Sequence, residues 1–116
     1  MRYLLSWHIH ESELHGRSPE WREEVAASLA VFEDELATSS ELEWIEVLGP
    51  ESQAVVVGPG AVVRDGVYNS DGKPAARIWA VRVTSKDRAV ELAAKLAGEL
   101  DTWVEVRECM PGAQRP

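Results

Sequence analysis

The order of helix and strand patterns along this chain constrains its fold more than any other feature. Residues 18–36 read SPEWREEVAASLAVFEDEL, with apolar side chains at helical spacing and with Ser18 and Pro19 suited to a first turn. A second helix is predicted over residues 85–98, with Ser85 as its N-cap and Gly98 as its C-terminal stop. Strands are predicted at residues 2–9, 42–48, 76–83 and 102–110.

The remaining segments are predicted to be loops and a turn. Residues 11–17 are polar and end in Gly16, which predicts a loop, and two extended segments at 54–57 and 61–64 flank a turn at Gly58-Pro59-Gly60. The resulting order, β-α-β-(turn)-β-α-β, predicts an α+β fold of the ferredoxin-like kind. It has four antiparallel strands and both helices on one face. We expect one domain over residues 1–110 and a C-terminal tail over 111–116.

Side-chain alternation on the first strand predicts which residues face the helices. Tyr3, Leu5, Trp7 and Ile9 form the more apolar set and should lie under the helices, so that His8 and His10 point to the opposite face. The second strand is ambiguous, because Ile45 and Val47 look buried and so do Trp44 and Leu48.

The opposite face of the predicted sheet carries an apolar patch, made by Leu4, Ile78, Ala80 and Trp103. Patches of this kind usually mark an interface. We therefore expect a symmetric homodimer in which two such sheets pack face to face and enclose a partly polar cavity.

The predicted topology brings chemically useful side chains to one end of this cavity. His8 or His10 would be the catalytic base, since histidine titrates near neutral pH. Asp71 or Glu105 would orient it, Tyr68 or Arg82 would make a polar contact, and Trp103 would form a wall. The alternative is that the histidines are ordinary polar groups at a strand end and that Asp71-Gly72 only forms a turn.

Composition and motifs argue against several functions. The formal net charge of −8 disfavours nucleic acid and anionic membranes, and no stretch is long and apolar enough to span a bilayer. Cys109 is the only cysteine, no secretory signal pattern is visible, and we expect a cytoplasmic protein. Phosphate-binding, dinucleotide-binding and hydrolase-elbow motifs are not found, so no cofactor is expected. No metal site is expected either, because His8 and His10 lack a clear third ligand, Glu105, Asp71 and His15 being the candidates.

Short motifs spread over most of the chain resemble one known family. The start MRYLL, the helix opening SPEW, the segment VVRDG with a second Asp-Gly shortly after it, and the run LAAKLA are similar to the YCII-related proteins of the DGPF branch. The resemblance implies a dimeric α/β barrel of ferredoxin-like protomers. Its wider superfamily includes cofactor-free monooxygenases, isomerases and cyclases.

The chain departs from this family pattern at two places. The signature Asp-Gly-Pro-Phe is replaced by Asp71-Gly72-Lys73-Pro74-Ala75, and Leu29 stands where relatives carry a helix histidine. Two functions stay open. One is a cofactor-independent enzyme acting by proton transfer, cyclisation, isomerisation or oxygenation on a small, largely apolar molecule. The other is a non-catalytic dimer that senses a metabolite or binds a partner.

Overall fold

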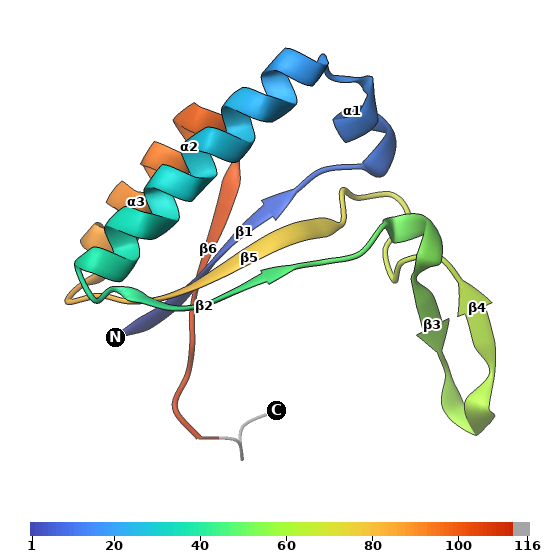
Figure 1. The fold of residues 1–116 in the computed structure, drawn as a ribbon. Helices are drawn as coiled ribbons and strands as arrows, with labels where there is room; N and C mark the ends of the chain where they lie inside the picture. Colours follow the sequence, from blue (N-terminus) through green and yellow to red (C-terminus); the bar gives the residue numbers. More distant parts are fainter. Residues whose placement is uncertain (113–116) are drawn as a thin grey trace.

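The protein has an α+β architecture built on one four-stranded antiparallel sheet, as a computed structural model of residues 1–112 shows (Figure 1). The sheet order is β2-β5-β1-β6, which is compatible with a ferredoxin-like fold. Helices α2 and α3 cover one face and leave the other open. The elements are β1 (Arg2–His8), α1 (Glu11–Gly16), α2 (Pro19–Thr38), β2 (Leu42–Val47), β5 (Ala75–Arg82), α3 (Lys86–Leu100) and β6 (Val104–Glu108).

Helix α2 forms as its sequence predicts. The Ser18 hydroxyl accepts a hydrogen bond from the backbone N–H of Trp21 at 3.1 Å, and Pro19 occupies the first turn. Its apolar stripe is buried against the sheet, where Phe32 packs edge-on against Trp79 with ring centroids 6.2 Å apart.

The alternation predicted for β1 is confirmed, because Tyr3, Leu5 and Trp7 all lie in the core beneath the helices. A bulge between Leu42 and Trp44 resolves the ambiguity of β2: Ile45 aligns with the buried Trp79. Trp44 aligns with Ala80 and therefore lies on the open face.

Ala80 contributes less to the open face than the sequence suggested. It is only 1% exposed, because Leu4 of β1 and Trp44 of β2 flank it in register on the same face. The apolar surface around Ala80 is therefore supplied by its larger neighbours Leu4 and Trp44.

Two local predictions were wrong. Residues 11–17 are not a loop, because the chain forms the short helix α1, whose first backbone N–H, that of Glu11, is satisfied by the distant carboxylate of Glu51. Helix α3 does not stop at Gly98. It continues to Leu100, whose buried side chain anchors the last turn, and it ends at Asp101 in the left-handed conformation.

The turn predicted around residues 58–60 is confirmed and belongs to a separate two-stranded hairpin. After the 3-10 turn η1 (Glu51–Gln53), strands β3 (Val55–Val57) and β4 (Val63–Asp65) pair with one another and flank the 3-10 turn η2 (Pro59–Ala61). Figure 1 shows the hairpin beyond the end of the main sheet, extending toward the side opposite α2 and α3. The radius of gyration is 15.8 Å, whereas a compact domain of this length has about 13 Å.

The tail expected at residues 111–116 lies mostly outside the described part, which ends at residue 112. Within residues 1–112, no helix has the length and apolar character needed to cross a membrane.

Candidate functional site

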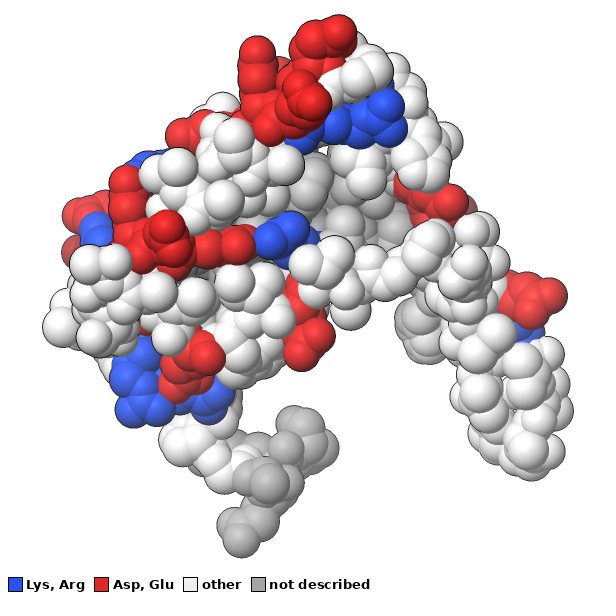
Figure 2. Space-filling view, viewed as in Figure 1, with Lys and Arg blue, Asp and Glu red and all other residues white. Residues whose placement is uncertain are grey.

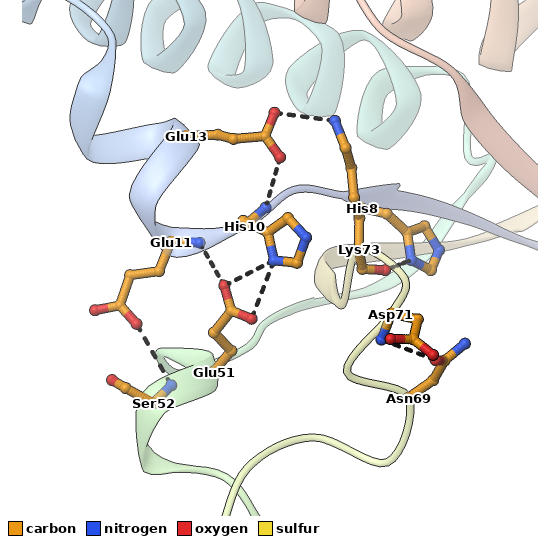
Figure 3. Close-up of polar contacts among 9 residues, drawn as sticks. All are labelled: His8, His10, Glu11, Glu13, Glu51, Ser52, Asn69, Asp71 and Lys73. Carbon is orange, nitrogen blue, oxygen red and sulfur yellow. Dashed lines mark hydrogen bonds and ion pairs between the residues drawn. The ribbon is translucent and has the colours of Figure 1, made fainter.

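His10 forms a histidine–carboxylate pair with Glu51 at the start of α1 (Figure 3). The Nδ1 atom of His10 lies 3.2 and 3.3 Å from the two carboxylate oxygens of Glu51. A carboxylate only accepts, so Nδ1 carries the proton that it donates, and the neutral ring keeps its lone pair on Nε2. The side-chain hydrogen bonds of the ring to Glu51 both use Nδ1. This arrangement is that of a positioned general base.

Glu51 is held in place by more than His10. Its Oε1 accepts a 2.7 Å hydrogen bond from the backbone N–H of Glu11, and Glu11 in turn accepts a hydrogen bond from the backbone N–H of Ser52. The Glu11 N–H is the largest influence that lowers the pKa of the Glu51 carboxyl, and His10 lowers it further. The carboxylate is therefore ionised and fixed where it can orient an imidazole.

His8 is bound on both sides of its ring. Its Nδ1–H donates to the backbone carbonyl of Lys73 at 3.1 Å, so in the neutral ring Nε2 accepts from the Ser6 hydroxyl, also at 3.1 Å. A base needs an unoccupied lone pair, and His8 has none to offer in this state. Of the two predicted histidines, His10 is the better placed for proton transfer.

Lys73 links the two histidines through the neighbouring helix. Its Nζ donates to Glu13 at 2.9 Å, and this hydrogen bond is the largest influence that lowers the pKa of the Glu13 carboxyl. Glu13 also accepts from the backbone N–H of His10 at 3.5 Å. Figure 3 shows these side chains gathered around the end of β1. The loop that precedes β5 is thereby tied to the start of α1.

A groove of about 530 Å³ opens between α1, the ends of β1 and β5, and the root of the hairpin. Its volume lies within the range of small-molecule sites. Glu11, Glu51 and His15 belong to its lining. His10 does not, although its partner Glu51 and its sequence neighbour Ile9 do. The other apolar lining residues are Leu14, Leu48, Pro50, Ala54, Val67, Pro74, Ala75 and Ala76.

Asp71 does not take the orienting role that the sequence suggested for it. The hydrogen bond it makes is local, from its backbone N–H to the Asn69 side chain at 3.1 Å, and no bond within residues 1–112 joins its carboxylate to either imidazole. This is turn chemistry of the kind expected at Asp-Gly. Glu51 orients His10 instead.

Two other predicted site residues lie apart from the histidines. Tyr68 is 86% exposed, in the loop after the hairpin. Arg82 is at the far end of β5, opposite Arg2, whereas His8 pairs with Ala75 at the near end, a separation of about 20 Å along the strand. Both Arg82 and Arg2 bind Glu43.

The residues predicted from the last strand lie near the histidine end without contacting it. Glu105 pairs in register with Ser6, on the open face that also carries His8. Trp103 is 93% exposed and lies over a second shallow groove between α3 and β6, so within this chain it forms no wall around His10.

Sequence reasoning missed Glu51 and the groove. Glu51 is 41 residues from His10 in the sequence, beyond the reach of any local pattern, and the only nearby signal was the Gly49-Pro50 pair that ends β2. Among residues 1–112, no group of three or more His, Cys, Asp or Glu side chains is placed to hold a metal ion.

Comparisons of the chain with models of known protein families and with curated proteins gave no match.

Proposed function

We propose that this chain is a small-molecule-binding homodimer of the dimeric α/β-barrel kind, related to the YCII and DGPF proteins that its motifs resemble. The ligand lies in the groove beside α1, and His10 transfers a proton to or from it. The open sheet face, with Trp44, Leu4 and Ile78, is the surface on which the second protomer packs.

One observation carries this proposal: Glu51, which orients the imidazole of His10, lines a largely apolar groove. The apolar lining favours a small hydrophobic body, and the carboxylates of Glu11 and Glu51 repel an anionic one. The ligand class is therefore a neutral, largely apolar molecule. Proton abstraction at carbon next to a carbonyl is the reaction that one oriented base supports without a cofactor, and it is the first step of many isomerisations and cyclisations.

Binding can be tested with the neutral fluorescent probe N-phenyl-1-naphthylamine. Leu48 lines the groove and is exposed, so Leu48→Asp places a charge there at little cost to folding. The control is Val47→Asp, since Val47 is adjacent and exposed and does not line the groove. We expect about tenfold weaker probe binding in L48D and unchanged binding in V47D. Equal affinity in both variants would contradict the site.

Proton transfer can be tested by nuclear magnetic resonance in D₂O, with exchange of the α-protons of 4-phenyl-2-butanone as the readout. We expect the protein to accelerate exchange, and we expect His10→Ala to abolish the acceleration while His15→Ala retains it. His15 is the matched control because it is a histidine that lines the groove and has no carboxylate partner within residues 1–112. Exchange at the uncatalysed rate would contradict the enzymatic role.

A second candidate is a non-catalytic binding protein with structural histidines. It is favoured by the hydrogen bonds of Glu51, which join α1 to η1, and by the ring of His8, which is satisfied on both sides. In that case His10→Ala would lower the melting temperature and leave binding of the naphthylamine probe unchanged.

A further inference from the structure

We infer that the β3–β4 hairpin is an intersubunit arm that grips a second copy of this chain. The arm is defined here as residues 55–65. The inference rests on the homodimer proposed above and extends it to a surface that the sheet-to-sheet packing does not include.

The arm is apolar and unusually free of charge. Residues 52–63 contain no charged side chain, and this is the longest such run in a sequence of which 28% is charged. Val55, Val57, Val62 and Val63 are each more than half exposed. Figure 2 shows the projecting hairpin as almost wholly uncharged, in contrast to the acidic surface of the helices. An exposed apolar surface of this kind marks an interface.

The chain itself supplies little support for this arm. Within residues 1–112, β3 and β4 form a sheet of two strands and pair only with each other. The root is closed by a 2.8 Å hydrogen bond from the Gly66 N–H to the Ala54 carbonyl, and the turn at the tip is closed by a 2.7 Å bond from the Gly58 N–H to the Val62 carbonyl, so both bonds lie within the hairpin itself. A two-stranded hairpin is only marginally stable in water. Packing against another surface would stabilise it.

The position of the arm favours a second copy as the occupant of that surface. The arm extends toward the open side of the main sheet, so a body seated on the open face would contact the arm as well (Figure 1). That face carries three arginines, Arg2, Arg82 and Arg107. They are balanced by Glu46 and Glu105 on the same face and by Glu43 at the β2 bulge, which binds Arg2 and Arg82.

This balance of charge decides where two copies can meet. The chain carries a net charge of −8, so two copies repel one another over most of their surfaces. A face with equal numbers of both signs matches a copy of itself around a two-fold axis. The arm carries only one charge of each sign, Arg64 and Asp65, and so adds no net charge.

The open face alone is smaller than a standard stable interface, so a stable dimer needs a further contact. Four strands spaced about 4.8 Å apart and about 20 Å long present a flat area of about 400 Å². A standard stable interface buries about 800 Å² per partner. The arm, two strands wide and about five residues long on each side, extends the contact beyond the sheet, and in a symmetric dimer each copy contributes one.

The test is a pair of charged variants compared by sedimentation equilibrium. Val57 and Val63 are cross-strand partners, so V57K/V63E places a complementary pair across the hairpin and leaves the net charge unchanged. The control is V31K/V90E, which makes the same exchange at exposed valines of α2 and α3. We expect the native chain to be a dimer. The dimer dissociation constant should be at least tenfold higher in V57K/V63E and unchanged in V31K/V90E. Far-ultraviolet circular dichroism checks that each variant is folded.

Three outcomes would contradict the proposal that the arm contacts a second copy. They are a monomeric native chain, equal dissociation in the two double variants, and a folded V57K/V63E whose dimer is as tight as the native one. Trp44→Glu tests the open face separately. If Trp44→Glu dissociates the dimer while V57K/V63E does not, the result supports the proposed sheet packing and contradicts the role of the arm. Probe binding to L48D is measured independently, so the ligand proposal survives or fails on its own.

Discussion

Glu33 is the side chain whose removal we expect to destabilise this fold most for its size. Its Oε1 accepts a 2.6 Å hydrogen bond from Arg77 and a 2.9 Å hydrogen bond from the indole N–H of Trp79. Trp79 is fully buried, and the side chains of Arg77 and Glu33 are 23% and 17% exposed. Glu33 is therefore the shared acceptor for a cation and for an indole N–H beneath α2.

Glu33→Ala removes the shared acceptor of both hydrogen bonds. Leaving a buried N–H without a partner costs about 1–3 kcal/mol. Breaking a buried ion pair costs about 3–5 kcal/mol, and here less, because Arg77 is partly exposed and can reach water. We expect a loss of about 2–4 kcal/mol in the free energy of unfolding, which for a domain of this size lowers the melting temperature by about 8–16 °C.

The matched control is Glu35→Ala on the same helix. Glu35 pairs with Lys95, and both side chains are about half exposed, so the loss should stay below about 0.5 kcal/mol. Urea unfolding followed by tryptophan fluorescence measures both variants. The double variant E33A/R77L should recover part of the loss, because no unpaired charge remains beneath the helix. A Glu33→Ala variant as stable as Glu35→Ala would refute the reasoning.

Two further predictions concern stability. Gly98→Ala should raise the free energy of unfolding by about 0.5–1 kcal/mol in thermal denaturation, because α3 continues through Gly98 and an added methyl group meets no atom within 4 Å; a lower melting temperature would contradict this. Acid should destabilise the fold. Hydrogen bonds, from Arg88 to Glu41, from Arg2 to Glu43 and from the backbone of Glu11 to Glu51, lower the pKa of each carboxyl. Their contribution is complete above the unfolded pKa of about 4.3 and is lost as pH falls through the lower native values, so a melting temperature that stays constant from pH 6 to pH 3 would contradict it.

The sheet and its buried face follow from local sequence patterns. Tyr3, Leu5 and Trp7 alternate with more polar residues, and two helices require an apolar surface to cover, so alternation alone assigns the faces of β1. The rule fails at Arg77, a charged residue that is only partly exposed. Arg77 is aligned with Trp7 on the helix side, and only the three-dimensional contact with Glu33 makes this position acceptable.

The candidate site was only half predictable, for a physical reason. The position of His10 at the end of a strand can be read from nearby residues. Its partner depends on where the chain returns after α2 and β2, and that is set by packing along 41 intervening residues. The short helix α1 could not be predicted from the sequence for the same reason. It has no apolar stripe of its own, and it begins where Glu51 supplies an acceptor for its first N–H.

The groove and the arm share their structural support. Gln53 and Ala54 lie at the root of the arm and also line the groove, as does Val67 in the segment that follows β4. Glu51, which orients His10, lies in the turn η1 that leads into the arm. Hydrogen bonds of Glu51 and Glu11 hold η1 to α1, so the segment that leads into the arm is also the one that orients the imidazole of His10. A dimer that grips the arm would therefore also fix the wall of the groove and the orientation of its base, so the affinity for N-phenyl-1-naphthylamine should rise with protein concentration across the range in which the dimer forms. The same probe affinity at all protein concentrations would show that the groove does not depend on the dimer contact of the arm.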